Sequence, residues 1–128
     1  MCALALWGAL APACHREPLD TICPALAAGD LVVTEIRGPQ SGADTYGQWI
    51  ELYNASGAQV ALAGVALKFV RLDGGDDGVV LVRDDTVAVA PGAYVVLGRR
   101  DPANVPAHVN YGYLPDFDRD FFSGAVVR

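Results

Sequence analysis

The sequence predicts an all-β protein, a β-sandwich of short antiparallel strands. From Leu31 onward the chain consists of short apolar runs separated by Gly, Pro, Asn and Asp, a pattern typical of many strands joined by turns. Several runs alternate between two kinds of side chain, as strands with two different faces do. No stretch keeps an apolar period of 3.6 residues, so little helix is expected.

Six strands are expected in order along the chain, at Leu31–Arg37, Gln48–Asn54, Ala66–Leu72, Val79–Val82, Thr86–Val89 and Tyr94–Gly98. The connections contain residues that favour turns. Residues 38–44 hold Gly and Pro and cannot form a helix, and residues 73–78 are rich in Gly and Asp. Ala90-Pro91-Gly92 predicts a tight turn, because Pro presets φ at its second position.

Alternation predicts which side chains of the first two strands face the core. In the second strand Ile50 and Leu52 share the core face. The other face of that strand carries Trp49, Glu51 and Tyr53. In the first strand the same rule predicts two opposite faces. One face carries Val32, Thr34 and Ile36, and the other carries Leu31, Val33 and Glu35.

The N-terminal extension predicts export. Residues 2–13 are uncharged and too short for a membrane-spanning helix, which takes roughly 20 apolar residues, but they have the length of a signal-peptide apolar region. Leu10-Ala11-Pro12-Ala13-Cys14 resembles a bacterial lipoprotein signal, in which Cys14 is lipidated. Two alternatives stay open: a secretory signal with a Cys14–Cys23 disulfide, and a buried apolar segment. We expect a signal in residues 1–14, a tether in 15–29 and a globular domain in 30–128.

Composition limits the function classes. The chain has 128 residues, 52% of them hydrophobic, which is enough for one domain with its own core. Its net charge of −6 disfavours nucleic acid as a partner, since phosphate backbones are repelled. The three Cys all lie in the first 23 residues and cannot form a paired CxxC metal site.

Four blocks together resemble the lamin-tail domain, an immunoglobulin-like sandwich of nuclear lamins and many bacterial surface proteins. The most specific block is Trp49-Ile50-Glu51-Leu52-Tyr53-Asn54, preceded by Leu31–Ile36 with its single Glu35. Val60–Leu67 and the strand–turn–strand pattern of Val89–Leu97 follow. The resemblance implies an immunoglobulin-like fold with Glu35, Trp49, Glu51, Tyr53 and Asn54 as structural residues. Thr34 and Val65 stand where the family often has Asn and Trp.

The last residues raise the question of truncation. Such domains usually end with further strands, whereas here Ala125-Val126-Val127-Arg128 is an apolar run with no partner visible in the sequence. One interpretation is a fold truncated at its C-terminus, which would leave a sheet edge or a core face exposed.

Few residues predict chemistry, and we expect no enzyme and no cofactor. Glu35 and Glu51 lie within strands, where a carboxylate accepts hydrogen bonds or pairs with Arg more often than it catalyses. Asp116, Asp118 and Asp120 alternate as in calcium loops but lack the Gly and Glu that complete an EF-hand, so they are weak candidates. The other acidic residues that could gather around a cation are Asp73, Asp76, Asp77, Asp84 and Asp85.

The segment from Pro102 to Asp116 is long for a loop in a compact domain. Its aromatic residues, Tyr111, Tyr113 and the following Phe117, suggest a binding loop if they are exposed. The alternative is that they close the open end of the sandwich. His108, beside Val105-Pro106-Ala107, is expected to be solvated.

Two functions fit these observations. The first is a non-catalytic binding or scaffold module for a protein or glycan. A lipid at Cys14 would anchor it to a bacterial membrane, at the outer membrane or cell surface. The second is an accessory domain of a secreted hydrolase, a nuclease or phosphatase, whose catalytic part lies outside this chain. Fold alone does not decide between them.

Overall fold

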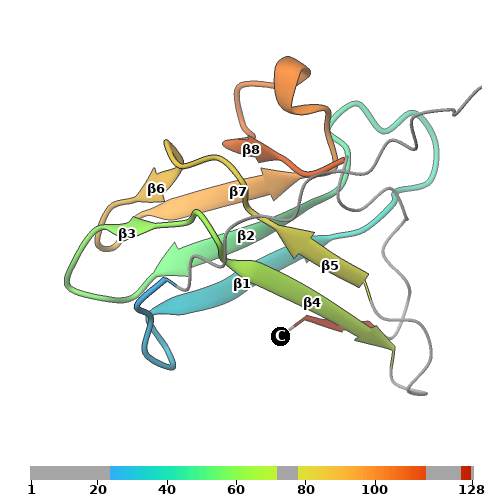
Figure 1. The fold of residues 1–128 in the computed structure, drawn as a ribbon. Coiled ribbons are helices and arrows are strands. Elements are labelled where there is room, and N and C mark those ends of the chain that lie inside the picture. The colour runs from blue at the N-terminus through green and yellow to red at the C-terminus, as the bar shows by residue number, and fades with distance from the viewer. Residues whose placement is uncertain (1–23, 72–77, 115–124, 128) are drawn as a thin grey trace, which may run out of the picture.

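The described part of the chain is all-β. The computed structural model describes residues 24–71, 78–114 and 125–127, and Figure 1 shows them as strands joined by turns. The strands are β1 (Leu31–Arg37), β2 (Trp49–Asn54), β3 (Val60–Ala61), β4 (Ala66–Arg71), β5 (Gly78–Leu81), β6 (Ala88–Val89), β7 (Tyr94–Gly98), β8 (Tyr111–Gly112) and β9 (Ala125–Val127). A short 3-10 helix, η1 (Pro102–Asn104), precedes β8.

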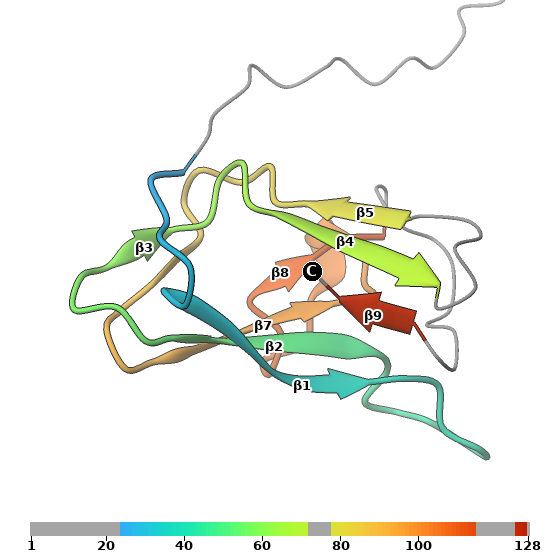
Figure 2. The same cartoon turned by 90° about the horizontal axis from the view of Figure 1, so that it is seen from below.

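The strands form two facing layers. One layer is a four-stranded sheet in the order β1-β2-β7-β8, and the other is a three-stranded sheet in the order β5-β4-β9. The small pair β3-β6 lies at one end. Figure 2 shows β4 and β5 on one side and β1, β2 and β7 on the other. The described strand pairs are antiparallel except for β7 and β8, which run parallel.

The core lies between the layers and joins both sheets in one cluster. In β2, Ile50, Leu52 and Asn54 are buried, while Trp49, Glu51 and Tyr53 are half-buried, which confirms the predicted alternation. The aliphatic face of β2 therefore faces the core. The cluster contains Ile50, Leu52, Val60, Leu62, Val65, Leu67, Phe69, Val80, Val82, Val89, Val95, Leu97, Tyr111 and Tyr113.

The turn before β7 has the geometry that its residues predict. Ala93 N donates to Ala90 O at 3.1 Å, and Gly92 between them has a φ of +71°. A positive φ at the third position with Pro91 at the second defines a type II turn. The turn sets β7 beside β2, and Asn54 N donates to Ala93 O at 3.0 Å.

The first strand corrects the alternation expected for it. A bulge between Val33 and Glu35 adds one residue to β1, so that Val33 lies opposite Leu52 and Ile36 lies opposite Ile50. Val33 and Ile36 therefore lie on the side of the sheet that carries Leu52 and Ile50, although simple alternation placed them on opposite faces. β1 is an edge of its sheet, and both side chains remain partly exposed.

Three observed strands were not expected. The two-residue strands β3 and β8 are too short to show a period in the sequence and form through their partners β6 and β7. The C-terminal apolar run, for which the sequence showed no partner, pairs with β4 as β9, with Val70 opposite Val126. All three strands form because they pair with strands elsewhere in the chain, which local sequence patterns do not show.

Candidate functional site

The two strand carboxylates lie opposite each other, next to the bulge in β1. Glu35 pairs with Glu51 across β1 and β2. The Thr34 hydroxyl, at the bulge, donates to Glu51 Oε1 at 2.8 Å. Glu51 thus accepts a hydrogen bond within the sheet, as expected for a carboxylate in mid-strand. Two like charges directly opposite each other work against strand pairing, so this bond offsets part of that cost.

Asn54 is a fully satisfied polar side chain in the core. It is 0% exposed, and its amide nitrogen donates to Ala58 O at 2.8 Å and Val89 O at 2.9 Å. Its Oδ1 accepts from Ser56 N at 2.9 Å and from the Ser56 hydroxyl at 2.7 Å. Asn54 therefore ties the end of β2 to the following turn and to β6.

Tyr111 and Tyr113 do not form a binding surface, which corrects that expectation. Both are buried, and Tyr113 is 0% exposed. Tyr111 OH donates to Leu81 O at 3.3 Å and accepts from Arg83 N at 3.2 Å. Burial raises the pKa of the Tyr113 phenol. The rings of Tyr111 and Tyr113 enter the core because β8 pairs with β7. Phe117, the third aromatic residue of the predicted loop, lies outside the described residues.

The acidic candidates give no metal site in the part of the chain that is described. Asp84 accepts from Thr86 N at 2.8 Å and from the Thr86 hydroxyl at 2.6 Å, which lowers its pKa and marks it as a turn residue. Within residues 24–71, 78–114 and 125–127, no three His, Cys, Asp or Glu side chains gather around one point. The candidates outside the described residues are Cys14, Asp73, Asp76, Asp77, Asp116, Asp118 and Asp120.

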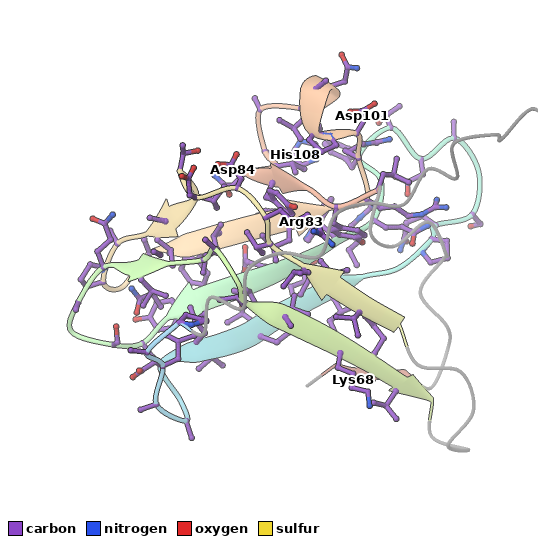
Figure 3. All side chains as sticks on the ribbon, viewed as in Figure 1. Lys68, Arg83, Asp84, Asp101 and His108 are labelled. Atoms are coloured by element: carbon purple, nitrogen blue, oxygen red, sulfur yellow. The ribbon has the colours of Figure 1, made fainter. Side chains whose placement is uncertain are left out.

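A different surface forms where two loops meet. The β1–β2 loop and the segment between β7 and β8 lie side by side, and Figure 3 labels His108 and Asp101 on the second of them. The His108 ring packs edge-on against Tyr46, with ring centroids 5.8 Å apart, and against Trp49 at 5.5 Å. His108 Nε2 lies 3.2 Å from Tyr46 O. His108 is exposed, as the sequence suggested, and its contacts also join the two loops.

Arg37 lies over the rings of Trp49 and Tyr46. Its Cζ lies 4.7 Å from the centroid of the Trp49 ring and 5.9 Å from that of Tyr46. Both distances suit a cation–π contact. We call Arg37, Tyr46, Trp49 and His108 the aromatic–arginine surface. Tyr46 is an exposed member of this surface, with 62% of the residue accessible.

Asp44 fixes the loop that carries Tyr46. Arg37 Nη1 donates to both carboxylate oxygens of Asp44 at 3.0 Å. Asp44 Oδ1 also accepts from Tyr46 N at 3.2 Å and from Gly47 N at 3.1 Å. The Arg37 hydrogen bond is the main reason that the pKa of Asp44 lies below its ordinary value. The loop is therefore held in one arrangement by a charge-assisted network.

A shallow pocket beside this surface carries arginine. Its lining includes Gln40, Asp44, Gly47, Gln48, Arg99 and Arg100. The Arg100 guanidinium rests against Gly47, where an added Cβ would come within 2.5 Å of the nearest guanidinium nitrogen. Gly47 also has a φ of +82°, so this position suits glycine twice over. We call this hollow the Arg100 pocket.

Comparisons with known proteins return no match. No protein-family model matches the chain, and searches of curated proteins and of solved structures find none either. Within the described residues there is also no helix with the length and apolar content needed to cross a bilayer. The geometry of the aromatic–arginine surface and the Arg100 pocket therefore carries the functional interpretation.

Proposed function

We propose that this chain is a non-catalytic binding module with a lamin-tail-like, immunoglobulin-like sandwich, displayed on a bacterial surface. The observation that carries the proposal is the aromatic–arginine surface. Tyr, Trp and Arg are the residues that dominate the energy of many binding interfaces. Here all three gather at one end of the sandwich, together with His108.

The order of this surface supports a role in binding. Tyr46 is largely exposed, yet its loop is fixed by the Asp44 hydrogen bonds and its ring contacts His108. A side chain that is already held in place loses little conformational freedom when a ligand binds. Such an arrangement gives affinity without a large entropic cost.

The position of the surface supports display away from an anchor. The described chain enters the domain at Pro24, and Ala55 N donates to Asp30 O at 2.9 Å beside the Asn54 end of β2. The aromatic–arginine surface lies at the Trp49 end of the same strand. A lipid at Cys14, which the sequence suggests, would thus hold the domain by one end and present the surface at the other.

The test of a binding role uses an array of neutral oligosaccharides, acidic oligosaccharides and peptides, probed with the full chain. We expect binding to one of these classes and at least about a tenfold loss in the Tyr46→Ala variant, since truncation of a hot-spot aromatic costs about 2 kcal/mol or more and a tenfold loss corresponds to about 1.4 kcal/mol. Tyr94→Ala is the matched control, because Tyr94 is exposed on β7 and contacts Tyr53, outside the aromatic–arginine surface. Binding that survives Tyr46→Ala, or no binding to any class, would count against the proposal.

A further inference from the structure

We infer that the Arg100 pocket binds the carboxylate of an acidic sugar while Tyr46 packs against the sugar ring. This inference rests on the proposed binding function and specifies its ligand class. The pocket adjoins the aromatic–arginine surface, because Asp44 and Gly47 line the pocket and both accept hydrogen bonds from Arg37. One ligand can therefore contact a cation and an aromatic ring together.

The charge of the pocket favours one negative group. Asp44 is already paired with Arg37 at 3.0 Å. Within the residues that the structure describes, no carboxylate lies within ion-pairing distance of the Arg100 guanidinium. Arg100 is half-buried against Gly47 and reaches the same hollow as Arg99. A planar guanidinium pairs with a carboxylate through two parallel hydrogen bonds, which makes a carboxylate the fitting counter-charge.

The other lining groups favour a ligand rich in hydroxyls. The Gln40 amide, whose Nε2 donates to Gly38 O at 3.1 Å, still has an N–H to donate and an oxygen to accept hydrogen bonds, and the Asp44 carboxylate can accept them. Sugar hydroxyls satisfy both kinds of partner. A phosphate carries more negative charge than a carboxylate and is therefore repelled more strongly by Asp44, which lines the same hollow. The pocket thus suits a ring that carries one carboxylate and several hydroxyls.

An exposed aromatic ring completes the site. The apolar face of a sugar ring needs an apolar partner, and ligand sites commonly combine aromatic walls with a few placed polar groups. Tyr46 offers such a ring beside the pocket with 62% of the residue exposed. A second hollow lined by Thr45, Arg100 and Asn104 continues from Arg100 along the adjoining loop. A chain of sugars can therefore extend past the first ring.

The experiment compares a short oligogalacturonate with its methyl ester in calorimetric titrations of the full chain. We expect the acid to bind and the ester to bind about ten- to a hundredfold more weakly, because the ester loses a charged hydrogen-bond pair. Arg100→Gln should bring the acid down to the affinity of the ester. Arg100→Lys should restore part of the difference, since it keeps the charge but not the two-pronged geometry.

Controls separate this inference from the general binding role. Lys68→Gln removes one positive charge from β4 in the other sheet and should leave the affinity unchanged (Figure 3). Equal binding of acid and ester, or full affinity in Arg100→Gln, would overturn the inference while Tyr46-dependent binding still supports the proposed function. Arg100-dependent binding of polyglutamate as tight as that of the sugar acid would assign the pocket to peptides and would also overturn it.

Discussion

Asn54 shows how a single residue links the most specific sequence block to the fold. The side chain lies in the core, where an amide without partners would cost several kcal/mol. Its amide group makes four hydrogen bonds, to Ala58, Val89 and both polar groups of Ser56. Asn54 ends β2, and its side-chain hydrogen bonds connect this strand to the following turn and to β6.

Asn54→Ala should lower the free energy of unfolding by about 3 kcal/mol, because it removes four hydrogen bonds of a side chain that is 0% exposed, including the buried one to Val89 O. Chemical denaturation monitored by circular dichroism measures this loss. Asn104→Ala, at an exposed position of η1, is the matched control and should change stability by less than about 0.5 kcal/mol. Equal losses in the two variants would show that the Asn54 hydrogen bonds are not what stabilises this end of the sandwich.

Asp44 predicts a pH-dependent contribution to stability. Its folded-state pKa is lowered from the ordinary value of 3.8, chiefly by the hydrogen bond from Arg37. A lowered pKa means that the stabilisation is complete above 3.8 and is lost as the pH falls through the folded-state pKa. Asp44→Asn keeps an oxygen for the Tyr46 and Gly47 amides but removes the charge. The wild type should therefore exceed Asp44→Asn in urea midpoint at neutral pH.

That difference should shrink as the pH falls below 3.8 and through the lowered pKa of Asp44, where the carboxylate becomes protonated. Asp84 also has a lowered pKa, but it is present in both proteins and cancels in the comparison. Urea unfolding curves across this range make the measurement. A difference that stays constant with pH would contradict the Arg37–Asp44 account.

At the scale of single residues, the sequence predicted which side chains of β2 face the core, but it did not predict the aromatic–arginine surface. Glu51 could be placed between Trp49 and Tyr53 because alternation is a local rule. Arg37, Tyr46 and His108 could not be brought together, since their contacts depend on how two distant loops meet. Gly47 was the one local sign in the sequence that another segment packs here, because a glycine beside a strand can mark the close approach of another part of the chain.

At the scale of elements, β1 is the strand whose role the structure changed most. Its boundaries agree with the prediction, but the bulge at Thr34 shifts the register after Val33. No local pattern in Leu31–Arg37 announces a bulge, because the extra residue is set by pairing with β2. The bulge also interrupts the free edge of the sheet, which natural proteins use to discourage pairing with other chains.

Ile36 and Ile50 are opposite each other in register but differ in burial, with 45% and 0% exposed. Ile50→Ala should cost about 3 to 4 kcal/mol of unfolding free energy, through lost burial and the cavity it leaves. Ile36→Ala should cost less than about 1 kcal/mol, because an exposed side chain loses little burial. Urea denaturation of the two variants tests this, and similar losses would mean that β1 is covered in solution.

At the scale of the whole molecule, the two ends of β2 lie in different surroundings. The Asn54 end meets the incoming chain, where Leu26 packs against the core, and the Trp49 end carries the aromatic–arginine surface. The six residues of β2 separate the two ends by about 17 Å, at roughly 3.3 Å per residue. This polarity suits a domain that is tethered at one end and binds at the other.

Replacing Cys14 with Ser tests the proposed tether. We expect the full-length wild type in the membrane fraction and the Cys14→Ser variant in the soluble fraction after cell fractionation, because a thioether-linked lipid needs the thiol. Cys23→Ser is the control and should leave the protein in the membrane fraction. A Cys14→Ser variant that stays with the membrane would rule out lipidation at this residue.

The most direct test of binding at the aromatic–arginine surface and the Arg100 pocket is to locate the bound ligand on the molecule. Isotope-labelled full-length chain is titrated with a short oligogalacturonate, and amide chemical shifts are followed by nuclear magnetic resonance. The account predicts saturable shifts in residues 37–49 and 99–108, with the largest near Tyr46, Gly47 and Arg100. Shifts confined to the opposite end, around residues 24–30 and 55–61, or no shifts at all, would contradict it.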